Sequence, residues 1–184
     1  TIGYLAQHQD LLSHRTIYEE LLEVKRPVIE LEERIRSLET EMKHTAGAEL
    51  EEMLSLYSRL THEFDLQNGY AYKSEITGVL KGLGFAEEEF GKTVSTLSGG
   101  QKTRVSLGKL LLSSPDIIML DEPTNHLDMD SREVLEAALE DYPGTILAIS
   151  HDRYFINRFA TRVMVLEQGG VKEYLGNYDD YLEK

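Results

Sequence analysis

Residues 117–128 read Ile-Ile-Met-Leu-Asp-Glu-Pro-Thr-Asn-His-Leu-Asp, and this stretch decides the fold class of the chain. Four apolar residues directly before Asp121 and Glu122 are typical of a strand that is buried in a parallel sheet. In open α/β sheets, ligands bind at the carboxyl ends of such strands. The stretch therefore predicts a strand that delivers two carboxylates to the ligand-binding edge of a parallel sheet.

A second stretch, Leu-Ser-Gly-Gly-Gln at residues 97–101, begins twenty residues before Ile117. It precedes a predicted helix, so the backbone N–H groups of Ser98, Gly99 and Gly100 and the helix dipole form an anion site without a lysine. The two glycines allow a ligand to approach the backbone closely. The alternative interpretation is an ordinary helix start that is capped by Ser98.

Both stretches resemble motifs of the ABC-type ATPase family. Residues 97–101 match the signature loop of that family, and residues 117–122 match its Walker B strand with the adjoining carboxylate. The sequence Glu-Pro-Thr-Asn-His-Leu-Asp at residues 122–128 resembles the narrower ABC-F subfamily, which consists of soluble twin-cassette ATPases that work on the ribosome. The resemblance covers essentially the whole chain, and it implies ATP and Mg²⁺ as cofactors.

The resemblance also implies which residues do the chemistry. Asp121 would hold Mg²⁺ through water, and Glu122 would polarise the water that attacks the γ-phosphate. His151 resembles the switch histidine that reaches the γ-phosphate. Gln7 resembles the glutamine that couples Mg²⁺ and water geometry to domain motion, and its assignment depends on its position alone. The alternative for the two carboxylates is a capped strand end exposed to solvent, and for His151 a structural role.

The same resemblance assigns Ser98, Gly99, Gly100 and Gln101 to the γ-phosphate of the ATP that the opposite nucleotide-binding domain holds. Asp128 would lie along the seam between the two domains, would cap the following helix, or would do both. Function therefore requires pairing with a second ABC cassette, either in the same parent chain or in a dimer mate.

The sequence contains no G-x-x-x-x-G-K-[ST] phosphate loop. Gly91-Lys92-Thr93 is similar to the end of such a loop, but Ala86 stands where the first glycine is required and no buried strand precedes it. We therefore expect the C-terminal part of a nucleotide-binding domain, cut after the phosphate loop. We also expect these 184 residues alone to be inactive in ATP hydrolysis.

Helices and strands alternate in the prediction for the second half of the chain. Helices are expected at 70–83, 101–112, 131–140 and 153–160, and strands at 117–121, 145–150 and 162–167. This alternation predicts an α/β fold, with a parallel sheet and covering helices. Gly169-Gly170 predicts a hairpin turn into a strand at 171–175, and a terminal helix is expected at 178–184.

Residues 16–67 carry a heptad pattern that predicts an antiparallel helical hairpin, here called the arm. Two apolar series follow steps of three and four residues on either side of Gly47: Ile17, Leu21, Val24, Val28, Leu31, Ile35, Leu38 and Met42, then Leu50, Met53, Tyr57, Leu60 and Phe64. The arm interrupts a partial ABC domain that comprises residues 1–15 and 68–184. Because the heptad phase continues through Pro27, we expect a kinked helix there; a new helix that starts at the proline is the alternative.

The arm contains 13 acidic and 6 basic residues, and charged segments of this kind are usually solvated. In the ABC-F family an arm inserted at this place contacts the ribosome near the exit site. The resemblance therefore implies the ribosome as a partner. A basic stripe that binds ribosomal RNA or an adjoining protein is expected from Lys25, Arg26, Arg34, Arg36 and Lys43.

The whole chain has 33 acidic and 19 basic residues, a net charge of −14, and no cysteine. This charge excludes a general attraction to nucleic-acid phosphates over most of the surface. No apolar run approaches the ~20 residues that cross a bilayer, so we expect no membrane insertion. The lack of cysteine is compatible with a cytoplasmic protein, which is our expectation.

Three other functions remain open at this point. A nucleotide-binding subunit of a membrane ABC transporter shares the catalytic motifs, but the heptad hairpin after Gln7 has no obvious use in it. A chromosome-maintenance or repair ATPase also inserts a coiled coil before its signature, but a far longer one. A non-enzymatic scaffold with relict motifs would be recognised by its lack of ATP turnover. The prediction is an ABC-F ATPase, in which closure of two cassettes positions the arm on the ribosome.

Overall fold

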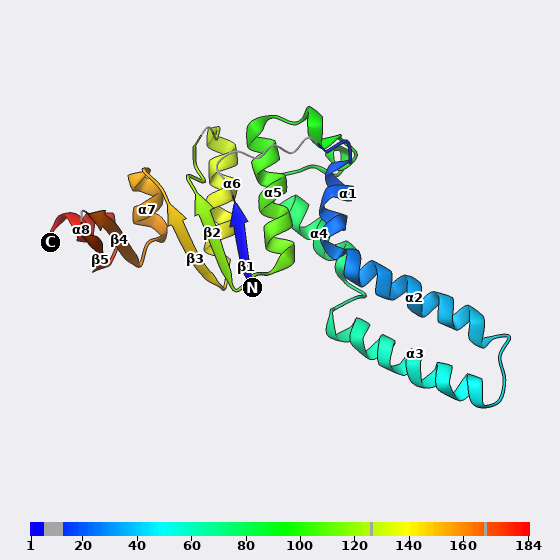
Figure 1. Cartoon of the computed structure of the whole chain (residues 1–184). Helices are drawn as coiled ribbons and strands as arrows, with labels where there is room; N and C mark the ends of the chain where they lie inside the picture. The colour runs from blue at the N-terminus through cyan, green and yellow to red at the C-terminus, as the bar shows by residue number, and fades with distance from the viewer. Residues whose placement is uncertain (6–12, 126, 168) are drawn as a thin grey trace.

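The strand predicted at residues 117–121 forms the centre of a three-stranded parallel sheet. The computed structural model describes residues 1–5, 13–125, 127–167 and 169–184. The strand β2 (Ile117–Asp121) lies between β1 (Ile2–Leu5) and β3 (Thr145–Ile149), as Figure 1 shows. Because the three strands are parallel, their carboxyl ends lie at one edge of the sheet, where the chain continues to Glu122 and Ser150.

The two faces of this sheet differ in burial. Ile118 and Leu120 of β2 are buried, whereas Met119 between them is exposed, together with its cross-strand neighbours Tyr4 and Leu147. Such alternation follows from the two-residue period of a strand. The helix α5 (Gly99–Ser113) packs against β1 and against α6 (Met129–Glu140). In the part of the chain that the structure describes, the apolar strand β2 is thus buried on one face.

The last two strands form a separate antiparallel sheet. β4 (Arg162–Glu167) pairs with β5 (Gly170–Leu175), and not with the parallel sheet that the alternating pattern predicts for it. Antiparallel neighbours need only a short turn, which Gly169 and Gly170 permit with φ of 116° and 148°. The hairpin prediction is therefore confirmed, and α7 (Arg153–Phe159) and α8 (Tyr178–Leu182) flank the hairpin (Figure 1).

Three helices pack together beside the parallel sheet, namely α1 (Ile17–Leu22), α4 (Tyr72–Gly82) and α5. Their shared interior consists of fully buried side chains: Ile17, Leu21, Ile76, Leu80 and Leu107. Two short 3-10 turns, Glu87–Glu89 and Val94–Thr96, connect α4 to α5. The Gly91-Lys92-Thr93 tripeptide lies between these turns, where the carbonyl of Lys92 accepts the N–H of Ile17 at 3.0 Å. This tripeptide anchors the start of α1 and is not part of a phosphate loop.

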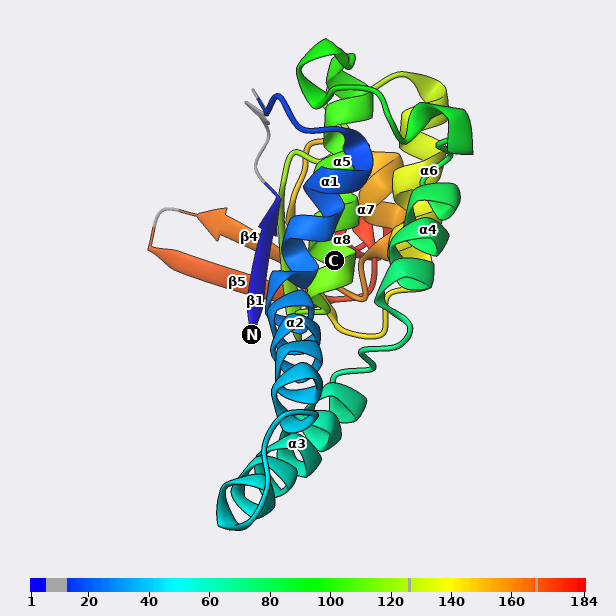
Figure 2. The same cartoon turned by 90° about the vertical axis from the view of Figure 1, so that its right-hand side faces the viewer.

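The rest of the heptad segment projects from the body of the molecule, as Figures 1 and 2 show. It consists of α2 (Arg26–Met42) and α3 (Ala48–Leu66), joined by a turn in which Gly47 has φ 72°. The buried heptad residues of these two helices are Val28, Leu31, Ile35, Leu38, Leu60 and Phe64. The predicted side-by-side helices are thus present, and α1 lies apart from them because it packs against α4 and α5.

The structure corrects the expectation for Pro27. α1 and α2 are separate helices linked by a 3-10 turn (Glu23–Lys25), and Pro27 lies in the first turn of α2. Proline suits this position because its fixed φ is compatible with a helix and its missing N–H has no intrahelical acceptor there. A new helix therefore starts at the proline. The apolar seam continues because the connecting turn is itself helical.

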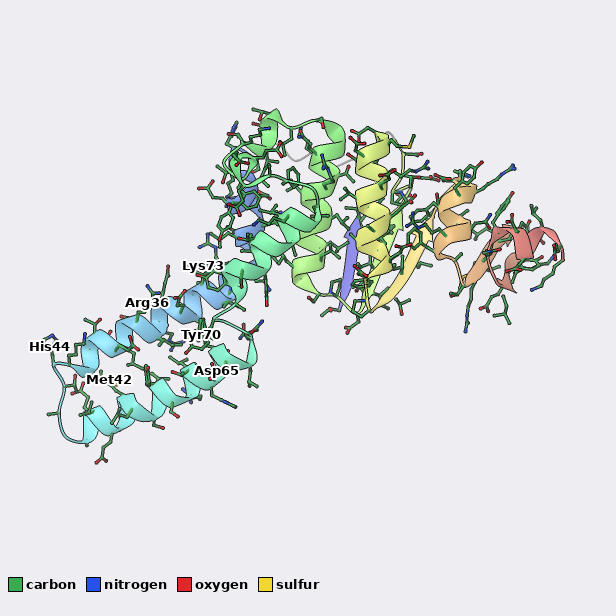
Figure 3. The ribbon with its side chains drawn as sticks, turned by 180° about the vertical axis from the view of Figure 1, so that it is seen from behind. Arg36, Met42, His44, Asp65, Tyr70 and Lys73 are labelled. Atoms are coloured by element: carbon green, nitrogen blue, oxygen red, sulfur yellow. The ribbon has the colours of Figure 1, made fainter. Side chains whose placement is uncertain are left out.

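The five basic residues expected to form a stripe do not all share one face of the arm. Lys25, Arg26 and Arg36 each pair with a glutamate, at N–O distances of 2.8, 3.0 and 2.5 Å. Arg34 and Arg36 stand two positions apart in α2, so they point about 200° apart around the helix axis. Figure 3 shows the arm with Arg36 and the tip residue His44 labelled. Three of the five expected stripe residues are thus paired with carboxylates.

Candidate functional site

Asp121 ends β2 at the carboxyl edge of the parallel sheet, where the sequence predicts it. The phenol of Tyr4 in β1 donates a hydrogen bond to Asp121 Oδ2 at 3.2 Å. Tyr4 stands one residue before Leu5, the partner of Leu120 in the strand register. Two adjacent strands therefore orient this carboxylate, and the sequence pattern did not reveal the contribution of Tyr4.

Glu122 leaves the strand in a left-handed backbone conformation, with φ 46°. Its N–H donates to the carbonyl of Ile149 at 2.8 Å, and its own carbonyl accepts the N–H of Asn125 at 3.1 Å. Non-glycine residues rarely adopt this conformation, and it occurs preferentially where a site needs a particular side-chain direction. The hydrogen bonds on both sides of Glu122 hold the residue in this conformation.

The structure brings His151 to Glu122, although the two residues follow different strands. The imidazole Nε2 lies 3.4 Å from Glu122 Oε1, and the backbone N–H of His151 donates to Glu122 Oε2 at 3.3 Å. The Glu122 side chain is 11% exposed, whereas that of His151 is 96% exposed. His151 thus contacts both carboxylate oxygens of Glu122, and its imidazole remains accessible to a ligand.

A second carboxylate supports the backbone that carries His151. Asp152 caps α7, because its Oδ1 accepts the N–H groups of Tyr154 and Phe155 at 3.0 and 3.3 Å. Its other oxygen pairs with the guanidinium of Arg132 in α6. Sequence reasoning missed Arg132, since nothing in its spacing indicates a contact with Asp152. The pair connects the helix after Asp128 to the loop that presents His151.

Ser98 begins α5 as the cap of the helix. Its hydroxyl accepts the N–H of Gln101 at 3.2 Å, and the side chain of Gln101 accepts the N–H of Ser98 at 3.1 Å. Each of the two side chains therefore accepts the backbone N–H of the other residue, as in an ordinary capping box. The N–H groups of Gly99 and Gly100, in the first turn, have no acceptor within the helix. An anion at this end of α5 would meet backbone donors.

Asp128 and Gly100 bring the starts of α6 and α5 together. The Asp128 side chain caps α6 by accepting the N–H of Ser131 at 2.7 Å. That backbone hydrogen bond lowers the pKa of the Asp128 carboxyl, and the charge of Arg104 lowers the pKa further. A Cβ on Gly100 would lie only 2.7 Å from Ser131 Oγ, so a side chain does not fit there. The capping interpretation of Asp128 therefore holds.

The donors at the sheet edge suit a small divalent cation. Mg²⁺ is typically bound by one or two carboxylates together with the phosphates of a substrate, and Asp121 supplies a carboxylate of this kind. No cluster of three or more potential metal ligands occurs among the described residues. Gln7, the other predicted metal-site residue, lies outside the described residues.

Comparison with known proteins identifies the family. The family model described as ABC transporter matches residues 1–125, which is more than half of the chain. The chain belongs to the ABC transporter family. Among the described residues, none of the helices of this ABC protein has the length and apolar character that a membrane crossing requires.

Its relatives among curated proteins include several F-type members of the ABC family. The ATP-binding protein YdiF of Bacillus subtilis is 46% identical over the whole chain, which spans 29% of YdiF. ABC transporter F family member 5 of Arabidopsis thaliana is 33% identical over 98% of the chain, which spans 26% of that relative. The energy-dependent translational throttle protein EttA of Mycobacterium tuberculosis is 42% identical over 73% of the chain and is matched over 24% of its length. The predicted ABC-F resemblance is confirmed.

Solved structures of ABC proteins share the fold. The dimeric, post-hydrolysis structure of the ATP-binding cassette MJ0796, bound to ADP and Pi, matches with a TM-score of 0.59 at 23% identity. The match covers 95% of this chain and 62% of that cassette. An ATP-binding subunit of an ABC transporter matches with a TM-score of 0.64 at 17% identity, over 99% of this chain and 61% of the subunit. The predicted ABC nucleotide-binding fold is thus confirmed.

Proposed function

We propose that this chain is part of an ABC-F ATPase that hydrolyses ATP to close two cassettes against one another. The main supporting observation is the state of Glu122, which combines a left-handed backbone with a carboxylate held by the N–H of His151. A carboxylate fixed in this way at the carboxyl edge of the sheet is suited to receive a proton from an attacking water.

The other residues have complementary roles in this proposal. Asp121 would hold Mg²⁺ through water, and the cation would supply charge neutralisation at the phosphates. His151 donates from its exposed imidazole to the γ-phosphate. The first turn of α5, from Ser98 to Gln101, binds the γ-phosphate of ATP held by a second cassette, and Asp128 lies along the seam. Gln7 couples the metal site to movement of the cassettes.

We place this ATPase in the cytoplasm, with the ribosome as the partner of the arm. The support is the projecting pair of helices α2 and α3, together with a relative whose name describes a translational throttle. Because Arg34 and Arg36 point to different sides of α2 and three of the five basic groups are paired with carboxylates, we do not propose a general RNA-binding stripe on the arm. Shape and local polar contacts carry the recognition.

A nucleotide-binding subunit of a membrane ABC transporter is the second candidate. The support is the likeness in fold to an ATP-binding subunit of an ABC transporter. The arm and the F-type relatives favour the ribosomal function. Fractionation of cells separates the two candidates, since an ABC-F protein accompanies ribosomes and a transporter subunit accompanies membranes.

The substitution Glu122→Gln in the full-length protein tests the proposed chemistry. It keeps the size of the side chain but removes its basicity, so we expect ATP turnover to fall by roughly 10²–10⁴ with little change in ATP binding. Single-turnover hydrolysis and nucleotide-binding assays measure the two effects. The substitution is made together with inactivation of the second cassette; turnover within about threefold of wild type would show that another group is the base.

A further inference from the structure

The polar side chains at the root of the arm converge on one carboxylate. Glu75 of α4 accepts a hydrogen bond from the Lys25 ammonium at 2.8 Å through Oε2 and from the Asn68 amide at 2.5 Å through Oε1. Lys25 directly precedes α2, and Asn68 follows α3. Glu75 therefore holds both ends of the projecting helix pair, and these contacts lower the pKa of its carboxyl.

A second contact ties α4 to α2 about two turns beyond Lys25. The phenol of Tyr72, which is buried, donates to Glu32 Oε2 at 3.0 Å. Glu32 belongs to α2, and its other oxygen binds Arg36 at 2.5 Å. In Figure 3 the labelled residues Tyr70 and Lys73 mark the junction where α3 passes into α4. The first two turns of α2 are thus fastened to α4 at separate points.

The same root is packed tightly onto α5, the helix that begins with Ser98. A Cβ on Gly108 of α5 would lie 2.9 Å from Leu83 and 3.2 Å from Leu21, so α5 approaches α1 and the end of α4 closely. Glu20 of α1 pairs with Lys109 of α5 at 2.5 Å, and the Glu20 side chain is only 5% exposed. α1, α4 and α5 therefore form one packed unit.

Two connections join the projecting pair of helices α2 and α3 to this unit, and both are short non-α segments. They are the 3-10 turn Glu23–Lys25 and the residues between α3 and α4. Without Glu75, these segments would be the natural hinges, since short connecting segments absorb changes in φ and ψ. With Glu75 in place, Lys25 on the first segment and Asn68 on the second both bind the Glu75 carboxylate of α4.

We propose that Glu75 is a positioning residue that fixes the direction of α2 and α3 relative to α5, so that a partner bound to the arm acts on the first turn of α5, from Ser98 to Gln101. The coupling to ATP turnover rests on the function proposed above. The fixed direction itself does not, because it follows from the contacts that join α4 to the two ends of the projecting helices.

Distances between spin labels test the fixed direction in the full-length protein. These 184 residues contain no cysteine, so Ala46→Cys at the arm tip and Ser113→Cys at the end of α5 supply the two labels, with any cysteine elsewhere replaced. We expect one narrow distance distribution in the parent protein and a broad one with Glu75→Ala or Glu75→Gln. The matched control is Glu87→Gln. It removes the ion pair between Glu87 and Lys81 of α4, at 2.5 Å, which does not involve the arm. It should leave the distribution narrow.

A charge swap separates positioning from folding. Lys25→Glu together with Glu75→Lys restores an ion pair, and the Asn68 amide can turn its oxygen to the new ammonium. We expect this double variant to return the distribution toward its narrow form, while each single variant stays broad. The proposal is overturned if Glu75→Ala leaves the distribution as narrow as in the parent, or if Glu87→Gln broadens it equally.

A second readout tests the coupling. We expect Glu75→Ala to lower ribosome-stimulated ATP turnover about fivefold or more, with turnover without ribosomes and co-sedimentation with ribosomes unchanged. Full stimulation in a variant with a broad distance distribution would refute the coupling. If ribosomes do not stimulate the parent protein, the proposed function fails, and the distance measurement still decides whether Glu75 fixes the arm.

Discussion

At the residue scale, conformational strain and burial coincide at Glu122. Its φ of 46° is a conformation that costs a residue with a side chain about 1–2 kcal/mol. Its carboxylate is largely buried, yet the two atoms that hold it come from the exposed His151 loop. A residue that was selected for stability alone would be glycine at this position. The strain is therefore best explained by the direction that the carboxylate must take.

Comparing Glu122→Gly with Glu122→Ala isolates this strain. Both variants lack the carboxylate, but only glycine adopts the left-handed conformation without a steric cost, so we expect Glu122→Gly to be more stable than Glu122→Ala by about 1 kcal/mol. Urea unfolding followed by circular dichroism measures the difference. An alanine variant as stable as the glycine variant would mean that the strained conformation is not retained.

The buried Glu20 carboxylate makes stability depend on pH. Burial raises the pKa of Glu20, but hydrogen bonds from Lys109 and Ser13 and the charges of Lys109 and Arg15 together outweigh burial, and the pKa lies below its usual 4.5. A lowered pKa stabilises the folded protein above the unfolded pKa, and this contribution is lost as the pH falls through the folded value. We expect wild type to exceed Glu20→Gln in free energy of unfolding at pH 7, by a margin that shrinks below pH ~4.5. Urea titrations across this pH range measure the margin, and a margin independent of pH would contradict the assignment.

At the element scale, α4 and α5 each contain a glycine, and the surroundings of the two differ. Gly78 of α4 has nothing within 4 Å of the position of a Cβ, whereas at Gly108 of α5 a Cβ would meet Leu83 at 2.9 Å. The first glycine is therefore only a weak point in the helix, and the second permits the close approach of α1, α4 and α5.

The same substitution at both positions should have different consequences. Gly78→Ala should stabilise the protein by about 0.5–1 kcal/mol, because alanine loses less conformational entropy in a helix. Gly108→Ala should lie about 1–2 kcal/mol below Gly78→Ala, since its methyl group forces Leu83 and Leu21 to move. Thermal unfolding of the two variants is the measurement. Equal stabilisation would show that the packing at Gly108 is looser than the distances indicate.

At the scale of the whole molecule, the heptad segment contributes to two separately packed parts. Ile17 and Leu21 are fully buried between α4 and α5, whereas the residues from Val28 onward pack within the projecting pair. The projecting helices α2 and α3 can thus be deleted without exposing the core only if α1 is kept.

Two deletions in the full-length protein test this division. Replacing residues 26–66 by a short Gly-Ser linker should preserve folding and basal ATP turnover and reduce co-sedimentation with ribosomes. Replacing residues 16–67 should lower stability severely, since it removes Ile17 and Leu21 from the core and leaves Lys109 without Glu20. Solubility, thermal unfolding and sedimentation at several salt concentrations distinguish the two. If the shorter deletion left co-sedimentation with ribosomes undiminished, the arm would not contribute to ribosome binding.

Local patterns in the sequence determined much of this protein. The strand before Asp121, the heptad seam and the Ser98 cap depend on residues a few positions apart, because strand and helix periods repeat over such distances. The motif around Glu122 also identified the family before any contact was known. These features were predicted with boundaries close to those observed, among them the strand Ile117–Asp121 and the helix Gly99–Ser113.

Contacts between distant segments were decided only by the tertiary structure. Glu20 meets Lys109 across 89 positions, Tyr72 meets Glu32 across 40, and His151 meets Glu122 across 29. The tertiary structure also decided that β4 pairs with β5 in a separate sheet. It likewise decided that a new helix starts with Pro27 in its first turn. No period in the sequence relates such residues, because their proximity depends on how whole helices and strands pack. Local spacing therefore specified the elements and the reactive groups, and packing specified which groups meet.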